Sequence, residues 1–351
     1  MDINQLFSEA VRLSASDLHL VVGFPPTLRV NGVLSPLEGT KPLTADVTSA
    51  LVLAVLSPEQ KELFLTNKEL DFSVPSAVGR FRVNAYYQKG TVSASFRLIS
   101  SSIRGIDELG LPAICHEFVK RRQGLILVTG PTGHGKSTTL AAMIGEINQT
   151  KALHIITIED PIEYIYPPSL SLISQREMHS DTHAWSVALR SALREDPDVV
   201  LVGEMRDYET IAAALTIAET GHLVFATLHT NSAAQTIDRI VDVFPENQQG
   251  QVRTQLASVL EGVISQRLVP AASGGRNVIA EIMLATPAIR TLVRDGKTHL
   301  VDNVIQTSAD LGMVTLETAL ARAVTERKIT MEVASSFAIR PEELGRLLKT
   351  Q

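Results

Sequence analysis

Short segments of alternating or apolar residues characterise the first hundred residues of the chain, which predicts strands there. Five segments have this pattern: residues 18–22, 27–30, 71–74, 81–87 and 92–98. Glycine and proline residues lie between the first two segments, and an Asn-Gly pair follows the second, as is typical of turns. The last two alternate regularly enough to form paired antiparallel strands. Residues 45–65 have apolar positions at the spacing of one buried helical face. The pattern therefore predicts a small α+β domain over residues 1–100.

A different pattern begins after residues 100–105, a small and polar stretch that predicts a hinge. Four apolar segments follow, with helical patterns between them: residues 125–129, 154–158, 199–202 and 223–228. Strands that alternate with helices form parallel sheets, because each crossover connection needs the length of a helix. We therefore expect a linker at residues 101–108 and an α/β core over residues 109–284.

The last part of the chain, residues 285–351, is polar and has helical spacing. It predicts a helical extension with helices at residues 287–294, 314–325, 331–337 and 341–348. The whole chain is thus expected to have an α/β fold in which a smaller α+β domain precedes the core. A length of 351 residues agrees with this division, because it exceeds one typical hydrophobic core.

Composition narrows the classes of function. Hydrophobic residues make up 44% of the chain and charged residues 20%, as in a globular protein. The net charge of −6, without a basic stripe or interleaved aromatic residues, argues against a nucleic-acid partner. Cys115 is the single cysteine, which excludes a disulfide framework and a cysteine-rich zinc site. We expect it to be a buried apolar residue.

The sequence lacks the features of a membrane protein. Its first residues show no basic segment followed by an apolar one, and no apolar run approaches the ~20 residues that span a bilayer. We therefore expect a cytoplasmic protein without direct membrane insertion, which reaches any membrane through a partner.

The strongest chemical motif is a phosphate loop with the spacing G-x-x-x-x-G-K-S. It consists of Gly130, Pro131, Thr132, Gly133, His134, Gly135, Lys136 and Ser137. A predicted strand precedes the loop and a predicted helix with Thr138 in its first turn follows, so backbone N–H groups and the helix start can surround a phosphate. Lys136 is expected to reach the β- and γ-phosphates and Ser137 to bind Mg²⁺. The predicted cofactors are ATP and Mg²⁺, and Thr138 completes the nucleotide-binding set.

Three carboxylates, Glu159, Asp160 and Glu163, follow the predicted strand at residues 154–158. Ligands of parallel sheets bind beyond the carboxyl ends of the strands, so these residues lie at the edge where the triphosphate is expected. Phosphoryl transfer to water needs a group that orients the water, and Mg²⁺ needs oxygen ligands. We assign the first role to Glu163 and support of the metal shell to Glu159. A solvated acidic turn is the alternative.

Glu204 and His229 follow the next two predicted strands. An apolar strand that ends at an acidic residue is typical of a Walker B site, where the carboxylate holds Mg²⁺ through water and helps to position the nucleophile. We assign this role to Glu204. His229 could donate a hydrogen bond to the γ-phosphate and report its loss, and a structural histidine is the alternative. That three successive strands end in such residues favours the catalytic interpretation.

Arginines are the remaining candidates for the site. P-loop ATPases often complete their site with an arginine from a neighbouring subunit or domain. Arg82 and Arg97 are favoured because they lie on strands of the same predicted sheet. A solvated surface cation is the alternative for each of them.

The order of these motifs resembles the secretion ATPase superfamily that powers type II secretion and type IV pili, and in particular its pilus-retraction branch, which acts in twitching motility. Besides the phosphate loop, the matching stretches are residues 16–20, 79–84, 158–164 (the Asp box), 193–207 (the Walker B box), 220–231 (the His box) and 288–295. The last of these resembles the C-terminal motif of the retraction branch. The resemblance extends over nearly the whole chain.

The resemblance implies a homohexameric ring of Mg²⁺-dependent ATPase motors. Each subunit is expected to have a PAS-like N-terminal domain and a RecA-like core, with ATP between them. The resemblance gives the family's catalytic roles to Lys136, Ser137, Glu163, Glu204 and His229. It further implies docking on the inner-membrane platform protein at the base of the pilus, which the ring turns to withdraw pilin subunits. A retraction ATPase paralogue is an additional implied partner.

Two other functions stay open within this resemblance: a pilus-assembly or type II secretion ATPase, and an ATP-binding ring component that is not a motor. One cysteine cannot form the four-cysteine zinc module of many secretion and assembly relatives, which favours retraction. The presence of all catalytic acids and arginines argues against a non-motor component. His134 stands where the family usually has serine. Its side chain is expected to point away from the phosphates, so we expect little loss of activity.

Overall fold

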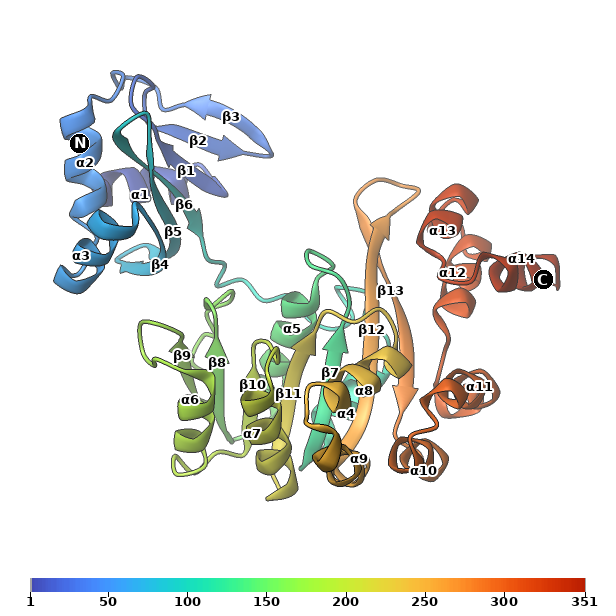
Figure 1. The fold of residues 1–351 in the computed structure, drawn as a ribbon. Helices are drawn as coiled ribbons and strands as arrows, with labels where there is room; N and C mark the ends of the chain where they lie inside the picture. The colour runs from blue at the N-terminus through green and yellow to red at the C-terminus, as the bar shows by residue number, and fades with distance from the viewer. Residues whose placement is uncertain (1, 351) are drawn as a thin grey trace. The chain divides into compact units, whose positions relative to one another are not determined.

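The computed structural model describes residues 2–350, which form two compact units (Figure 1). The first unit runs to Ser102 and includes the segment Pro161–Ile165, and the second comprises Ile103–Asp160 and continues from Tyr166. The backbone N–H of Ile165 donates to the carbonyl of Ser100, which ties this segment to the first unit. The core expected at residues 109–284 is thus interrupted by five residues that pack elsewhere.

A six-stranded antiparallel sheet with the order β3-β2-β1-β6-β5-β4 forms the first unit. Its strands are β1 (Asp17–Leu20), β2 (Thr27–Val30), β3 (Val33–Pro36), β4 (Glu69–Ser76), β5 (Gly79–Gln88) and β6 (Thr91–Leu98). The helices are α1 (Ile3–Arg12), α2 (Ala45–Leu53) and α3 (Pro58–Asn67). Phe7 of α1 stacks on Phe81 and meets the edge of Phe96, with ring centroids 4.1 and 5.4 Å away. These aromatic contacts join the helices to the sheet around one apolar core.

The helical pattern predicted over residues 45–65 is present but divided, because two helices, α2 and α3, form there. The hydroxyl of Ser57 accepts the N–H of Gln60, the amide of Gln60 accepts the N–H of Ser57, and Pro58 is the first helical residue. A capping box and a proline at this position favour a new helix start. The apolar spacing alone did not reveal this break. The short strand β3 was not predicted because all four of its residues are exposed.

A seven-stranded sheet with the order β13-β12-β7-β11-β10-β8-β9 forms the second unit. Its strands are β7 (Gly124–Thr129), β8 (His154–Glu159), β9 (Leu172–Glu177), β10 (Val199–Val202), β11 (Leu223–Leu228), β12 (Leu260–Pro270) and β13 (Arg276–Leu284). All neighbouring pairs are parallel except β12 with β13. The four predicted strands and their parallel direction are confirmed. Strands β9, β12 and β13 were missed because polar residues interrupt their apolar runs.

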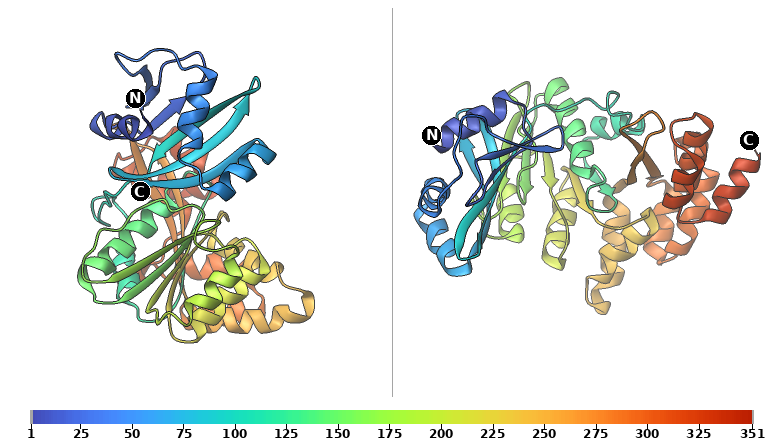
Figure 2. Two further views of the ribbon diagram at one scale, coloured as in Figure 1. Left: turned by 90° about the vertical axis from the view of Figure 1, so that its left-hand side faces the viewer. Right: turned by 90° about the horizontal axis from the view of Figure 1, so that it is seen from above.

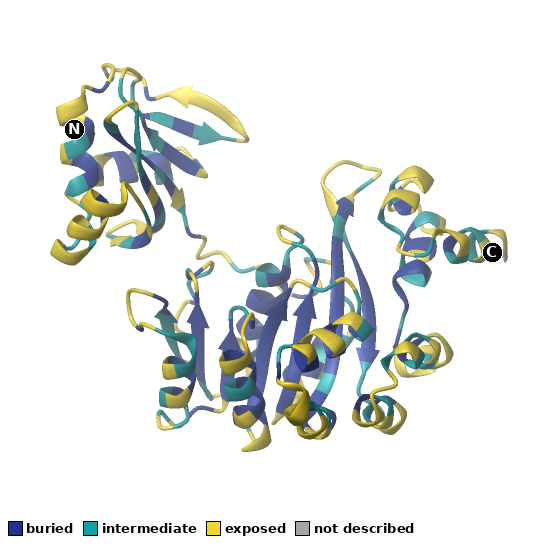
Figure 3. Cartoon of the chain, viewed as in Figure 1, coloured by how far each residue is buried: buried dark blue, intermediate teal, exposed yellow. Residues whose placement is uncertain are grey.

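Helices cover both faces of this sheet (Figure 2). On one face α4 (Ile114–Lys120) packs against α5 (Lys136–Thr150). On the other face lie α6 (Trp185–Ala192), α7 (Tyr208–Glu219), α8 (Ala233–Asp242) and α9 (Glu246–Val259). Strands β7, β10 and β11 are buried along their whole length (Figure 3), as expected for parallel strands between two helical layers. Cys115 is fully buried, as predicted, and burial raises the pKa of its thiol to about 12.

The last helices are α10 (Pro287–Asp295), α11 (Val301–Thr307), α12 (Leu316–Thr325), α13 (Met331–Phe337) and α14 (Pro341–Thr350), with the 3-10 turns η1 (Thr298–Leu300) and η2 (Ala309–Leu311). The predicted helical extension is present, although α11 was not expected. The predicted α/β fold is confirmed. Within residues 2–350, no helix combines the length and the apolarity needed to cross a bilayer.

Candidate nucleotide site

The phosphate loop connects β7 to α5 at the carboxyl edge of the seven-stranded sheet. Gly130, Gly133 and Gly135 have φ angles of 138°, 79° and 82°, which favour glycine. A Cβ on Gly130 would lie 2.4 Å from the carbonyl oxygen of Gln266, so the loop also needs glycine there for space. Gly135 precedes α5 and, having no side chain, cannot cap it. The start of the helix therefore depends on another acceptor for its N–H groups, and a phosphate fits this need.

Lys136 lies within the loop and is 8% exposed. Its ammonium group donates to the carbonyl oxygens of Gly130 at 2.9 Å and Pro131 at 3.1 Å. The Nζ atom also lies 3.4 Å from Nδ1 of His229. The two carbonyl acceptors are neutral, whereas phosphate oxygens are charged and bind an ammonium group more strongly. The lysine is therefore held where it can exchange these acceptors for a triphosphate.

His229 links the phosphate loop to Glu204. Its Nε2 atom lies 2.9 Å from Oε1 of Glu204. Its Nδ1 atom lies 3.2 Å from the hydroxyl of Thr132 and near the ammonium group of Lys136. A neutral ring with its proton on Nε2 satisfies this arrangement, because it donates to the carboxylate and accepts from the two donors.

Glu204 has two cationic or donating neighbours. Besides His229, Nε of Arg206 lies 2.6 Å from the same carboxylate oxygen. Burial is the largest single influence and raises the pKa of Glu204, but hydrogen bonds from Arg206 and His229 outweigh it, so the pKa lies below its ordinary value. The carboxylate is therefore ionised at neutral pH and can accept a hydrogen bond from water.

The strand order explains why these three residues meet. β7 lies next to β11 and β11 next to β10, all parallel, so the residues that follow them reach one edge. Lys136 follows β7, His229 follows β11 and Glu204 follows β10. A Cβ on Gly203 would lie 3.1 Å from the carbonyl of Ile158, so glycine allows the Walker B turn to pass close to β8. The structure thus brings together the three strand-end groups.

Glu159 is the last residue of β8 and is buried. Its Oε1 atom accepts hydrogen bonds from the hydroxyl of Thr157 at 2.6 Å and from the amide of Gln175 on β9 at 3.3 Å. The carboxylate is therefore held by two neutral donors of the sheet. Its role in the metal shell stays a prediction.

Three candidates belong to the first unit: Glu163, within Pro161–Ile165, and the two arginines. Arg82 on β5 and Arg97 on β6 are direct neighbours across the antiparallel pair, so they do share one sheet. Arg82 pairs with Asp71 at 2.6 Å and Arg97 with Asp17 at 2.8 Å. Each arginine therefore has a carboxylate partner in its own unit, and the contribution of all three residues to the nucleotide site stays a prediction.

The donors at the sheet edge fit Mg²⁺. Ser137 offers a hydroxyl in the first turn of α5 and Glu204 an ionised carboxylate. Mg²⁺ in nucleotide sites takes one or two such protein oxygens, directly or through water, and completes its shell with phosphates and waters. In the described part of the chain, no group of three or more His, Cys, Asp or Glu residues could hold a metal ion.

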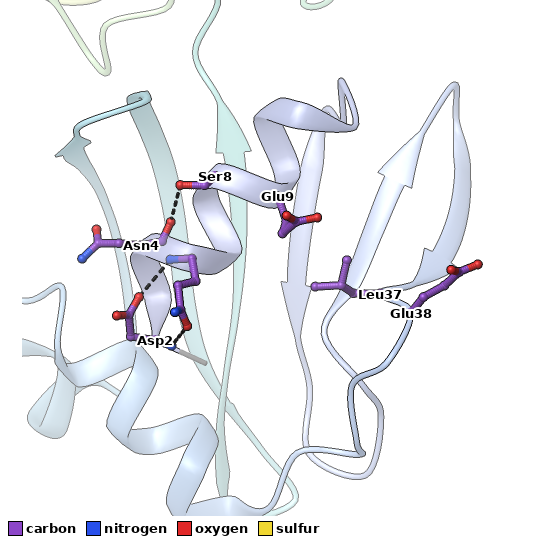
Figure 4. Close-up of a pocket in the computed structure, with 7 residues that line it drawn as sticks. Asp2, Asn4, Ser8, Glu9, Leu37 and Glu38 are labelled. Carbon is purple, nitrogen blue, oxygen red and sulfur yellow. Dashed lines mark hydrogen bonds between the residues drawn. The ribbon is translucent and has the colours of Figure 1, made fainter.

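A surface hollow of about 510 Å³ lies beside α1 in the first unit (Figure 4). It is lined by Asp2, Asn4, Gln5, Ser8, Glu9, Leu37 and Glu38. Its polar groups serve the helix itself: Asp2 and Gln5 form a capping box, and Ser8 donates to the carbonyl of Asn4. None of the predicted site residues lines it.

Three residues that were not predicted from the sequence lie beside the predicted set. Arg206 contacts Glu204, and Gln266 and Arg267 on β12 contact the phosphate loop and the His box, the latter through Asn231. A signal was present, because Ser265, Gln266 and Arg267 form a polar run inside a strand whose other residues are mostly apolar and buried. Buried polar side chains need partners, and here the partners lie in the phosphate loop and in the segment after β11.

Comparison with known proteins decides the family. The model of the type II/IV secretion system protein family matches residues 1–334. The chain belongs to this family. The type IV pilus retraction ATPase PilT of Pseudomonas aeruginosa is 49% identical over 344 residues, which cover 97% of this chain and 99% of that protein. The type IV pilus ATPase PilU of the same organism is 40% identical over 351 residues, which cover 99% and 92%.

A solved structure of a member of the secretion ATPase family has the same fold as this chain. The crystal structure of the pilus retraction motor PilT with bound ADP is 46% identical, covers 99% of both chains and superposes with a TM-score of 0.91. The predicted family, its retraction branch, the fold and the ATPase class are therefore confirmed.

Proposed function

We propose that this chain is an Mg²⁺-dependent ATPase that drives the retraction of type IV pili in twitching motility, as a homohexameric ring. The contact chain from Lys136 through His229 to Glu204 carries the proposal. It joins a phosphate-binding lysine to a carboxylate that is ionised at neutral pH. The full-length similarity to a pilus retraction ATPase supports the pilus as the target.

ATP binding begins at the phosphate loop. The N–H groups of residues 132–138 surround the phosphates, and Lys136 exchanges the carbonyls of Gly130 and Pro131 for β- and γ-phosphate oxygens. The hydroxyl of Ser137 and, through water, the carboxylate of Glu204 would hold Mg²⁺, which neutralises charge that develops on the phosphates. Glu159 supports the waters of this metal shell.

Hydrolysis needs a water molecule that is oriented toward the γ-phosphate, and two carboxylates provide this orientation. Glu204 and Glu163 accept hydrogen bonds from the attacking water and orient it toward the γ-phosphate. His229 responds to the γ-phosphate. When Lys136 turns to the nucleotide, its ammonium group leaves the Nδ1 atom of His229, so the contacts of the histidine depend on whether the phosphate is bound. Arg82 or Arg97 contributes positive charge from a neighbouring subunit or domain. Phosphate release then changes the domain arrangement, a rigid-body switch that a ring can pass on as rotation.

The proposal includes the surroundings of the motor. We place the ring in the cytoplasm at the inner-membrane base of the pilus, docked on the platform protein, with a retraction ATPase paralogue as a further partner. The proposed motor neither binds nucleic acid nor inserts into the membrane. We propose a PAS-like domain at residues 1–100, a linker at 101–108, a RecA-like core at 109–284 and a helical extension at 285–351.

Deletion of the gene followed by a count of surface pili tests the proposal. A retraction motor predicts more surface pili and no twitching, and the wild-type gene restores both phenotypes. An assembly ATPase predicts loss of surface pili instead. Steady-state phosphate release by the purified chain provides the second test, because a ring component that is not a motor releases none.

A further inference from the structure

Strand β12 continues beside the phosphate loop after β7 has ended. Ser265 is the register partner of Thr129, the last residue of β7, so the following residues of β12 flank the loop. Gln266 is fully buried at this position. Its backbone carbonyl already requires glycine at position 130, and a Cβ on Gly135 would lie 3.2 Å from its side-chain amide. Gln266 is thus packed against both ends of the loop.

The side-chain amide of Gln266 makes two hydrogen bonds. Its Nε2 atom donates to the carbonyl of His134 at 2.6 Å, and its Oε1 atom accepts the hydroxyl of Thr139 at 2.9 Å. The orientation of the amide is fixed, because a carbonyl oxygen only accepts and must therefore face the nitrogen. One amide thus ties the loop to the first turn of α5.

The first of these bonds sets the direction of a loop N–H group. The carbonyl of His134 and the N–H of Gly135 belong to one planar trans peptide and point in opposite directions. When Gln266 holds the carbonyl against β12, the N–H of Gly135 points to the other side of the loop. In phosphate loops successive N–H groups converge on an anion, and the N–H of Gly135 is available to join them on that side.

We propose that Gln266 is a positioning residue that orients the Gly135 peptide of the phosphate loop toward the triphosphate, an inference that rests on the nucleotide site proposed above. Gln266 touches no phosphate itself. It fixes the loop before ATP arrives, so less order has to be gained on binding. The loop contacts the phosphates both before and during hydrolysis, so Gln266 chiefly affects ATP affinity and KM, and affects kcat less.

His134 gives an independent attachment to the same strand. Its Nδ1 atom accepts the backbone N–H of Leu268 at 3.0 Å, and its ring meets Phe337 of α13 edge-on. The side chain is thus engaged by β12, while the Gln266 bond uses the backbone carbonyl. The variant His134→Ser removes the side-chain contact with Leu268 and leaves the hydrogen bond between Gln266 and the backbone carbonyl of residue 134. It is the matched comparison for a variant of Gln266, and its expected effect on ATP affinity is under about threefold.

The test measures ATP affinity by calorimetry, with KM and kcat beside it, on the full chain. Gln266→Leu removes both bonds at similar volume and is expected to weaken ATP binding about tenfold or more. Gln266→Glu keeps the acceptor for Thr139 but loses the N–H donor, so affinity falls at pH 8.5. At pH 6 it recovers in part, because a protonated carboxyl group can again donate to His134. A purely structural role would not produce this recovery.

Two further variants guard against loss of the fold. Thr139→Val removes only one bond and is expected to weaken affinity about threefold. Val263→Ala makes a cavity in the same strand away from the loop, so it lowers thermal stability and leaves affinity unchanged. Wild-type affinity in folded Gln266→Leu and Gln266→Glu overturns the inference. The variant Lys136→Ala shows which of the two proposals has failed. If this variant binds ATP with wild-type affinity, the nucleotide site itself is overturned. If it loses ATP affinity while the Gln266 variants keep theirs, only the role of Gln266 is overturned.

Discussion

The two units hold their candidate charged groups in different ways. In the second unit, Lys136 is buried and is connected through His229 to Glu204 by short contacts at the sheet edge. In the first unit, Arg97 has a side chain that is 70% exposed and pairs with Asp17 of its own sheet. Exposed ion pairs contribute little to stability, because water and salt screen them and the side chains lose freedom. Buried contacts of this kind are much harder to rearrange.

This difference separates groups that already lie together at one sheet edge from arginines that are each paired with a carboxylate of their own sheet. The second unit offers loop N–H groups, an ammonium group and an ionised carboxylate that lie together at one edge of its sheet. The first unit offers Arg97, whose side chain is largely exposed, and Arg82, and a phosphate would have to compete with the carboxylate partner of each. Binding is therefore expected to depend on the second unit, and the later, charge-stabilising step on the first. Each prediction below tests one side of this division.

The variant Lys136→Ala has the largest expected effect. It removes charge-assisted hydrogen bonds to two phosphates, so affinity for ATP falls about thousandfold or more and turnover is lost. Calorimetry with ATP and steady-state phosphate release measure the two effects. Lys120→Ala is the matched control, because Lys120 is an exposed lysine of the same unit that pairs with Glu117. Wild-type affinity in Lys136→Ala would contradict the preformed site.

The variant Glu204→Gln is next in size and affects the chemical step. It keeps the shape of the side chain but loses the ionised acceptor for water, so kcat falls about hundredfold to thousandfold. ATP affinity is retained, because the phosphate loop is intact. Single-turnover phosphate release together with an affinity measurement separates the two quantities. Glu209→Gln on α7 serves as the control, and equal kcat in both variants removes Glu204 from the mechanism.

The sequence predicted the central part of the second unit because its local signals agree. A glycine-rich loop between an apolar strand and a helix, and polar residues after two further strands, indicated an edge at which these groups meet. Strand β12 was missed although it flanks the loop. Its residues Gln266 and Arg267 make contacts with segments more than thirty residues away in sequence, and spacing along one strand does not show which distant loop will supply the partner.

The first unit shows a second limit of sequence-based prediction. The sheet that carries Arg82 and Arg97 was predicted from alternation, and their cross-strand pairing follows from its register. Their carboxylate partners were not predicted. Asp71 and Asp17 come from two other strands, and only the order β1-β6-β5-β4 places them beside the arginines. The break between α2 and α3 was missed for the opposite reason, since it rests on local capping that the apolar spacing does not include.

The variant Arg97→Ala tests the exchange of partners and has a smaller expected effect. Loss of one exposed charge-assisted bond lowers kcat about tenfold and leaves ATP affinity nearly unchanged. Arg82→Ala is the paired variant, because Arg82 is the cross-strand neighbour with its own carboxylate. Asp17→Asn frees Arg97 and is not expected to lower kcat. If both arginine variants and their combination keep wild-type turnover, the first unit supplies no arginine to the reaction.

The variant Glu281→Gln has the smallest expected effect on turnover, and it compares two carboxylates of the same unit. Glu204 accepts hydrogen bonds from Arg206 and His229 and has a lowered pKa. Glu281 on β13 is buried and accepts the first N–H of α8 at 2.7 Å. Burial, with the charges of Asp302 and Glu317, raises its pKa to about 7 against the opposing influence of Arg340. A raised carboxyl pKa favours folding while the group is protonated, and this contribution is lost as pH rises from 4.5 to about 7.

The loss corresponds to about 3 kcal/mol of unfolding free energy. Glutamine keeps the acceptor for α8 and does not ionise, so Glu281→Gln does not lose this contribution. Chemical denaturation of both proteins at pH 5 and pH 8 measures the difference: the variant and the wild type have similar stability at pH 5, and the variant is more stable at pH 8. Phosphate release at pH 7 stays near the wild-type value, because Glu281 acts on the end of α8 and not on the nucleotide. Parallel stability curves would mean that Glu281 ionises at an ordinary pKa, and the contrast with Glu204 would then be lost.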